Sequence, residues 1–158
     1  EYDVQLRPVN VRNLLDDALE EIENLASKRK SKIKVNFFIE ESAQVLCDAA
    51  RLEQVLDNLL VNSIKYSAEG SLVIVTVSSL KDKVEFKIKD HGFGISEEDL
   101  PHIFERFYRV DKARSRDAGG TGLGLSIVKH IIERHGETIK VESTEGVGTE
   151  FTFTLKRI

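Results

Sequence analysis

The fold of this chain is decided by one glycine-rich segment, Gly119-Gly120-Thr121-Gly122-Leu123-Gly124-Leu125-Ser126. Its four glycines fall within six positions, so the backbone can adopt positive φ and approach a ligand closely. A pattern typical of an amphipathic helix follows from Ile127 to His135, and Gly136 ends it. A glycine-rich turn before a helix presents free N–H groups and the positive end of a dipole, which favours a phosphate group. A flexible loop before an ordinary helix is the alternative.

Two common phosphate-binding motifs are excluded at this segment. A dinucleotide fingerprint requires G-x-G-x-x-G after a strand, but counting from Gly120 or Gly122 places Leu125 or Ile127 at the last position. A Walker A loop requires a lysine after its last glycine, and no lysine follows Gly124. The segment therefore belongs to another class of site.

Length and composition predict one soluble domain. The chain has 158 residues, 41% of them hydrophobic, which is enough for a core of its own. A net charge of −4 gives no reason to expect nucleic acid, and a single cysteine, Cys47, excludes an internal disulfide. No apolar run approaches the roughly 18 residues of a membrane span, so direct membrane contact is not expected. The basic run from Lys28 to Lys32 is predicted to be the solvated last turn of a helix.

Hydrophobic periodicity predicts alternating strands and helices. Pro8 suggests that the first strand lies at a sheet edge, and Asn10 and Asp48 can cap the first two helices. The expected strands are 4–9, 33–39, the short piece 43–47, 72–78, 84–89, 138–144 and 149–155. The first expected helix follows Asn10, has apolar positions from Leu14 to Ala26 and ends in the basic run; the others run from 49 to about 67, briefly from Ser96, and from Ile127 to His135.

The second helix carries a polar stripe beside its apolar face. Asn58, Asn62 and Lys65 recur at helical spacing, with Tyr66 next to them, about a quarter turn from the core positions. Asparagine is a poor helix former, so two of them at a core margin suggest a ligand site. Two ordinary solvated side chains are the alternative.

An aspartate is predicted to point into the core. Val84, Phe86 and Ile88 alternate with charged residues, and continuing this period puts Asp90 on the inward side. A buried carboxylate is costly unless it is paired. The turn Asp90-His91-Gly92-Phe93-Gly94-Ile95 follows, and a tight turn in which Asp90 binds backbone N–H groups is the simpler interpretation.

The order of these segments resembles the catalytic, ATP-binding domain of sensor histidine kinases. That domain belongs to the ATPase superfamily shared with DNA gyrase, the ninety-kilodalton heat-shock chaperone and mismatch-repair clamp proteins. The resemblance covers nearly the whole chain, 1–158, and rests on five ordered boxes: 58–67 (the asparagine box), 90–95 (D-x-G-x-G-I), 104–109 (the phenylalanine box), 120–125 (the glycine box) and the closing pair Gly148-Thr149.

The resemblance implies a fold and a lid. The expected fold is a two-layer α/β sandwich of the Bergerat ATP-binding type, with a mixed, mostly antiparallel sheet of about five main strands and three long helices on one face. The irregular segment 101–121 would be a mobile lid over ATP. Phe104 and Phe107 would pack this lid onto the domain or onto a partner domain.

The resemblance also implies the residues that bind ATP and Mg²⁺. Asp90 would accept the adenine amino group with support from Thr149, and Gly92 and Gly94 would lie against the base. Asn62 would coordinate Mg²⁺, and Lys65 would supply charge to the phosphates. The remaining expected nucleotide contacts are Tyr66, Ile95, Tyr108, Arg109, Gly120, Thr121, Gly122, Leu123, Gly124 and Leu125.

Position 58 distinguishes a kinase from a hydrolase. In gyrase-like ATPases this position carries a glutamate that activates water, whereas here it is Asn58, whose amide cannot take a proton at neutral pH. The predicted catalytic set is Asn58, Asn62, Lys65 and Arg109. Three small departures from the family are Ser63 in place of alanine, His91 in place of asparagine or threonine, and Glu137 in place of glycine.

The resemblance implies transfer of the γ-phosphoryl group to a histidine on a separate dimerisation domain, then to a response-regulator aspartate. None of the four histidines lies in a helical hairpin, so the acceptor domain is expected before Glu1, consistent with the absence of methionine. This fragment is expected to be a monomer and the full kinase a cytoplasmic homodimer, free or tethered to a membrane sensor. An ATP-driven conformational clamp and a nucleotide-sensing scaffold are the alternatives.

Overall fold

The computed structural model describes residues 3–108 and 124–158. Helices and strands follow one another along the chain in the order that the hydrophobic periodicity predicts. The strands are β1 (Arg7–Asn10), β2 (Lys32–Phe37), β3 (Gln44–Cys47), β4 (Leu72–Leu80), β5 (Lys83–Asp90), β6 (Ile139–Thr144) and β7 (Gly148–Arg157); the helices are α1 (Val11–Lys28), α2 (Ala49–Lys65), the short 3₁₀ helix η1 (Leu100–His102) and α4 (Gly124–Arg134).

The first two helices begin at the predicted caps. The Asn10 side chain accepts a hydrogen bond from the Asn13 N–H at 2.8 Å, and Asp48 accepts one from the Arg51 N–H at 3.3 Å. Both bonds satisfy donors that have no partner inside the helix. The helix start expected at Ser96 is smaller than predicted, because only the 3₁₀ turn η1 forms there.

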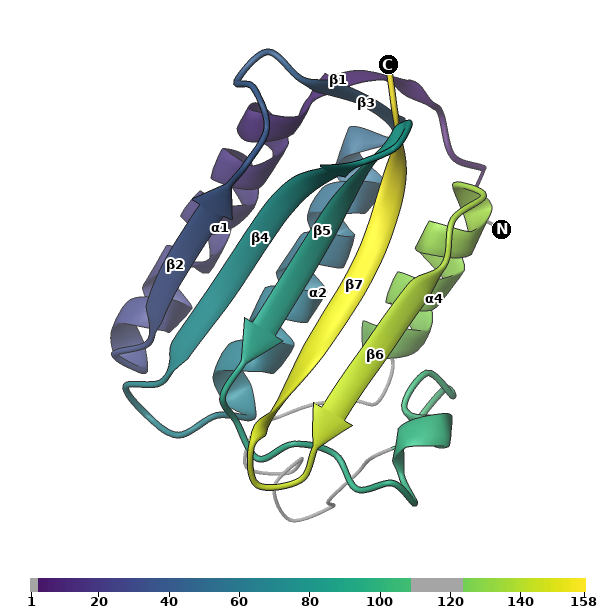
Figure 1. Cartoon of the computed structure of the whole chain (residues 1–158). Helices are drawn as coiled ribbons and strands as arrows, with labels where there is room; N and C mark the ends of the chain where they lie inside the picture. The colour runs from purple at the N-terminus through teal and green to yellow at the C-terminus, as the bar shows by residue number, and fades with distance from the viewer. Residues whose placement is uncertain (1–2, 109–123) are drawn as a thin grey trace.

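The sheet has seven strands, the expected five main strands and the two short segments that were also expected. Its order is β1-β3-β7-β5-β4-β2, and β6 pairs with β7 (Figure 1). The pairing of β2 with β4 is parallel and the other pairings are antiparallel, which confirms the predicted mixed sheet. The short segments β1 and β3 pair with each other and extend the sheet through the end of β7. Pro8 lies in β1 at the sheet edge, as predicted.

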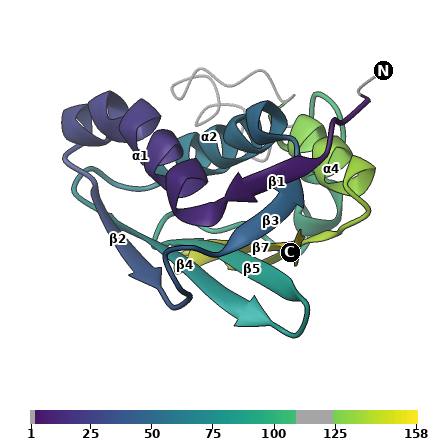
Figure 2. The same ribbon diagram turned by 90° about the horizontal axis from the view of Figure 1, so that it is seen from above.

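The three long helices cover one face of the sheet, and the other face is open (Figure 2). Alternate residues of β4, β5 and β7 point toward the helices and are buried. At the centre, the rings of Phe86 and Phe153 stack with their centroids 4.9 Å apart. These apolar layers form one continuous core that includes the inner faces of α1, α2 and α4. The fold is therefore the predicted two-layer α/β sandwich.

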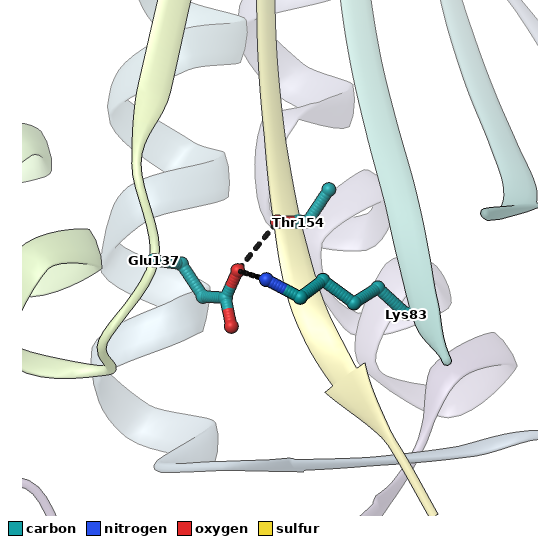
Figure 3. A network of polar contacts seen from close by, with 3 residues as sticks. All are labelled: Lys83, Glu137 and Thr154. Carbon is teal, nitrogen blue, oxygen red and sulfur yellow. Dashed lines mark hydrogen bonds and ion pairs between the residues drawn. The ribbon is translucent and has the colours of Figure 1, made fainter. Parts of the chain in front are cut away.

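A polar network joins the residue before β6 to strands β5 and β7 (Figure 3). Glu137, just before β6, accepts hydrogen bonds from Lys83 Nζ at 2.8 Å and from Thr154 Oγ1 at 2.6 Å. Thr154 lies in β7 between the residues that pair with β6 and those that pair with β3. The ion pair with Glu137 raises the pKa of Lys83. The glutamate that departs from the family glycine thus joins β5, β7 and the start of β6.

No helix within residues 3–108 and 124–158 combines the length and the apolar character that crossing a bilayer requires.

The stacked phenylalanines give a stability prediction. Phe153 is only 1% exposed, so Phe153→Ala leaves a cavity beside the Phe86 ring. The substitution should lower the free energy of unfolding by about 3–5 kcal/mol. Urea unfolding followed by circular dichroism measures this change. Phe38→Ala is the matched control, since Phe38 is 69% exposed and its loss should change stability by about 0.5 kcal/mol or less. Equal effects of the two substitutions would contradict the assigned core.

Candidate functional site

Asp90 ends β5 as a buried carboxylate with one oxygen left for a ligand. Its side chain is 5% exposed, which confirms the predicted inward direction. One oxygen, Oδ1, accepts hydrogen bonds from the N–H groups of Gly92 at 2.9 Å and Thr149 at 3.2 Å. Among the described residues, no hydrogen bond of normal geometry reaches the second oxygen, Oδ2. That oxygen is an acceptor available to a donor on a bound molecule.

Two opposing effects act on the ionisation of Asp90. Burial raises the pKa of its carboxyl group above the usual value, and this is the largest effect. The Gly92 and Thr149 N–H groups and the neighbouring Ser63 hydroxyl lower the pKa. Ser63 Oγ is itself fully buried and has no hydrogen bond of standard geometry. The serine that departs from the family alanine therefore adds a polar group behind the carboxylate.

The turn after Asp90 is held between two other segments of backbone. A Cβ at Gly92 would lie 2.3 Å from the Tyr66 carbonyl oxygen, and a Cβ at Gly94 would lie 2.1 Å from that of Thr144. Gly94 also has a φ of +72°. The Phe93 N–H donates to the Tyr66 oxygen at 3.0 Å. Side chains at the two glycines would push the turn away from both neighbours.

Ser143 joins this turn to the β6–β7 hairpin and was missed from the sequence. Its hydroxyl accepts a hydrogen bond from the Ile95 N–H at 2.8 Å, donates to the Gly148 oxygen at 3.0 Å and lies 2.8 Å from Thr149 Oγ1. In the strand pattern it looks like an ordinary polar residue of β6. Its pairing opposite Thr149 in the hairpin was the one signal that could have identified it.

The predicted polar stripe of α2 lies at the margin of the core. Asn58, Asn62, Lys65 and Tyr66 are all half-buried. Within the described part of the chain, their side chains make no hydrogen bond or ion pair. A Cβ at Gly124, the first residue of α4, would lie 3.6 Å from Asn58 Oδ1. The structure thus brings Asn58 to the start of α4, and among residues 3–108 and 124–158 the two amides and the ammonium group have no hydrogen-bond or ion-pair partner.

The first part of the expected lid is packed onto the domain. Ile103 is buried, and the Phe104 ring meets the Phe151 ring edge-on at 6.3 Å, with Lys129 Nζ 5.7 Å from the Phe104 centroid. Phe107 behaves differently, because it is 64% exposed and has a φ of +66°, which is rare for a large side chain. Of the two residues expected to pack this segment, Phe104 packs on the domain itself, and Phe107 is exposed to solvent.

Tyr108 is engaged within its own segment. Its hydroxyl donates a short hydrogen bond to Asp99, which also accepts one from Ser96 Oγ at 2.9 Å. The bond to Tyr108 lowers the pKa of Asp99, and the same bond raises the pKa of Tyr108 to about 12. The His102 ring stacks on that of Tyr108 at 5.2 Å. If Tyr108 contacts phosphates as expected, its hydroxyl must give up the hydrogen bond to Asp99.

Several predicted site residues lie outside the described residues: Arg109, Gly120, Thr121, Gly122 and Leu123. Gly124 and Leu125 are described, and both belong to the first turn of α4.

Three histidines have structural partners. His91 Nδ1 lies 2.9 Å from the Leu72 carbonyl oxygen, and His102 Nδ1 lies 2.6 Å from Glu105. His135 Nε2 accepts a hydrogen bond from the Asp48 N–H at 3.1 Å, so it joins the end of α4 to the cap of α2. These contacts agree with the structural role expected for them.

The Asn62 amide oxygen suits a hard cation that is also bound by the phosphate oxygens of a ligand. Within residues 3–108 and 124–158, no three His, Cys, Asp or Glu side chains lie close enough to hold a metal ion. The Asn62 amide is the kind of oxygen donor that Mg²⁺ accepts when phosphate oxygens and water complete its coordination.

Comparison with known proteins agrees with this geometry. A family model described as "Histidine kinase-, DNA gyrase B-, and HSP90-like ATPase" matches residues 47–158. The sensor histidine kinase WalK of Bacillus subtilis is 47% identical over 110 residues, which are 68% of this chain and 18% of WalK. This chain therefore spans less than a fifth of that relative.

Solved structures extend the similarity to the fold. The catalytic domain of histidine kinase ThkA, in a nucleotide-free form, has a TM-score of 0.83 and 29% identity, covering 96% of this chain and 95% of that domain. ThkA in complex with the response regulator protein TrrA gives a TM-score of 0.81 with 26% identity, over 98% of this chain and 42% of that one. Full-length ShkA in complex with AMPPNP gives a TM-score of 0.82 with 28% identity, over 99% of this chain and 32% of that one. With the family model matching residues 47–158 and histidine kinase catalytic domains sharing the whole fold, this chain belongs to the histidine kinase-, DNA gyrase B- and HSP90-like ATPases, as the catalytic ATP-binding domain of a sensor histidine kinase.

Proposed function

We propose that this chain binds ATP with Mg²⁺ and transfers the γ-phosphoryl group to a histidine on a separate dimerisation domain. The observation that carries the proposal is Asp90, a buried carboxylate at the end of a core strand, whose two hydrogen bonds of normal geometry within residues 3–108 and 124–158 both go to Oδ1. A buried acceptor of this kind suits the exocyclic amino group of adenine. The glycines at 92 and 94 let the turn after Asp90 pack closely against the Tyr66 and Thr144 carbonyl oxygens, which fixes the backbone beside the carboxylate.

The other half of the proposed site is the polar stripe of α2. Asn62 would bind Mg²⁺ through its amide oxygen, and Lys65 would face the phosphates as a point charge. Both residues are half-buried and have no hydrogen-bond or ion-pair partner among the described residues, which supports these roles. Tyr66 would border the nucleotide, and Thr149 would support the contact of Asp90 with the base. Arg109, Tyr108 and the segment from Gly120 to Leu125 remain predicted phosphate contacts.

Asn58 supports transfer to a protein nucleophile over hydrolysis. It stands beside the first turn of α4, where a general base would act on water, but an amide cannot accept the proton. With no base, the site would act by positioning ATP and neutralising charge. An ATP-driven clamp and a scaffold that only senses nucleotide remain the rival functions.

The proposed acceptor is a histidine outside this chain, with a response regulator as the next acceptor. The ring of Phe107 is a candidate contact for the dimerisation domain, because it is a large apolar side chain that is 64% exposed. ThkA has been solved with a response regulator, which supports the same kind of partner here.

The metal role of Asn62 can be tested by binding alone. Asn62→Leu keeps a similar volume but removes the oxygen donor, so the gain in ATP affinity on adding Mg²⁺ should fall at least about tenfold, equivalent to about 1.4 kcal/mol. Calorimetric titration with ATP in Mg²⁺ and in EDTA measures this gain. Asn24→Leu, on the exposed side of α1, is the matched control. A gain equal to that of the wild type would remove Asn62 from the metal site.

The division between donor and acceptor predicts how label from γ-labelled ATP is distributed. This chain alone should bind ATP without forming phosphohistidine. Adding the dimerisation domain of the same kinase as a separate chain should label that domain, but slowly, because the two chains lack the roughly millimolar effective concentration of a tether. Stoichiometric label on a histidine of this chain would contradict the proposal. Binding without transfer to the added domain would favour the scaffold.

A further inference from the structure

Arg29 differs from the other cations in its basic run. Lys28 and Lys30 are exposed, as the sequence predicts for the solvated end of a helix, but the prediction was wrong for Arg29, which is half-buried. Lys30 has a φ of +55°, and the Ser31 N–H returns to the Ala26 oxygen at 2.9 Å. The chain therefore turns sharply at the end of α1, and Arg29 points inward from that turn.

Arg29 binds the segment that follows α2 at two points. Its Nη2 donates a hydrogen bond to the Ser67 carbonyl oxygen at 2.6 Å, across 38 positions of sequence. Its own carbonyl oxygen accepts one from the Gly70 N–H at 2.9 Å. A hydrogen bond from a charged donor in a partly buried setting is among the stronger ones in proteins. The end of α1 thus holds residues 67–70 in place.

The guanidinium group of Arg29 is not fully satisfied in this position. Its Nε is buried and has no hydrogen-bond partner among the described residues. A buried donor without a partner lowers stability, so the contact with Ser67 comes at a cost to the fold. This pattern suggests a role for Arg29 beyond stability.

The segment that Arg29 holds is one wall of the Asp90 turn. The Tyr66 oxygen accepts the Phe93 N–H at 3.0 Å, and a Cβ at Gly92 would lie 2.7 Å from Ser67 Oγ. Ser67 Oγ in turn donates to the Ser63 oxygen at 2.6 Å, near the end of α2. A shift of Ser67 would therefore move the surface against which the turn at 92–93 rests.

We propose that Arg29 is a positioning residue for the base end of the nucleotide site. By fixing the Ser67 carbonyl group, it keeps the Tyr66–Ser67 wall against Gly92 and Phe93, so that Asp90 presents Oδ2 in a constant direction. Arg29 does not itself contact the nucleotide. The inference rests on the proposed function of the site, because it assigns the base end to Asp90.

The test combines local hydrogen exchange with ligand binding in three variants. Arg29→Met keeps the aliphatic stem but removes the hydrogen bond, and Arg29→Lys keeps the charge with a shorter reach. Arg12→Met is the matched control, because Arg12 lies at the opposite end of α1, with an ion pair to Asp16 at 3.0 Å and its guanidinium over the Phe37 ring. The ligands are adenosine, which probes the base end, and ATP with and without Mg²⁺.

In Arg29→Met, the Phe93 amide hydrogen should exchange about tenfold faster relative to amides at the centre of β4 and β5. Adenosine and ATP should lose affinity by the same factor, about tenfold, as expected where one charged hydrogen bond supports the binding conformation. The gain in ATP affinity on adding Mg²⁺ should stay as in the wild type, because Asn62 is unchanged. Arg29→Lys should recover part of the loss, and Arg12→Met should bind as the wild type does.

Three results would overturn the inference, and each differs from a failure of the proposed function. Normal adenosine affinity in Arg29→Met would overturn it, as would a uniform rise in exchange across the sheet without a selective change at Phe93. If Arg29→Met does not fold, the test uses Arg29→Lys. Wild-type Phe93 exchange and wild-type adenosine affinity in that variant would also overturn the inference. A wild-type chain that binds neither ATP nor adenosine would instead refute the proposed function.

Discussion

The arrangement of the site depends on one buried carboxylate at the end of β5. Burial raises the pKa of Asp90, so a fold that keeps its carboxylate ionised must supply hydrogen bonds to it. The turn provides one through Gly92, and the neighbouring strand provides the other through Thr149. Both reach the same oxygen. The carboxylate is thereby held in one orientation with its second oxygen left for a ligand, which is the property that base recognition requires.

Close backbone contacts surround this carboxylate, and each of them needs a glycine. A Cβ at Gly148 would lie 2.2 Å from the Asp90 carbonyl oxygen, so β7 can approach β5 at this point only with glycine there. Gly92 and Gly94 allow the same approach on the other sides of the turn. The helical layer then sets the distance from the turn to the α2 stripe, because α2 packs on the face of β5 from which Asp90 projects. Sheet pairing and helix packing thus bring the proposed base and metal groups to one end of the domain (Figure 1).

Sequence periodicity was sufficient for the parts of the site that follow a regular element. The inward direction of Asp90 came from the alternation of β5, and the half-burial of Asn62 came from the spacing of α2. The partners of these residues could not be predicted, because they depend on contacts between segments distant in sequence. Ser143 reads as a surface residue of β6 until its place opposite Thr149 is known, and Arg29 reads as a solvated cation until the turn at Lys30 directs it inward. The short strands β1 and β3 were predicted as extended segments, but their pairing with each other and with β7 could not be predicted for the same reason.

Discrimination between ATP and inosine triphosphate tests the assignment of Asp90 most directly. The two nucleotides differ at position 6 of the base, where the amino donor of adenine is replaced by a carbonyl acceptor. The free Oδ2 of Asp90 predicts that the wild-type chain binds ATP at least about tenfold more tightly, because two acceptors would otherwise face each other in a buried site. Asp90→Asn, which can donate from the same place, should reduce or reverse that preference. Equal affinity of the wild type for both nucleotides would contradict the assignment.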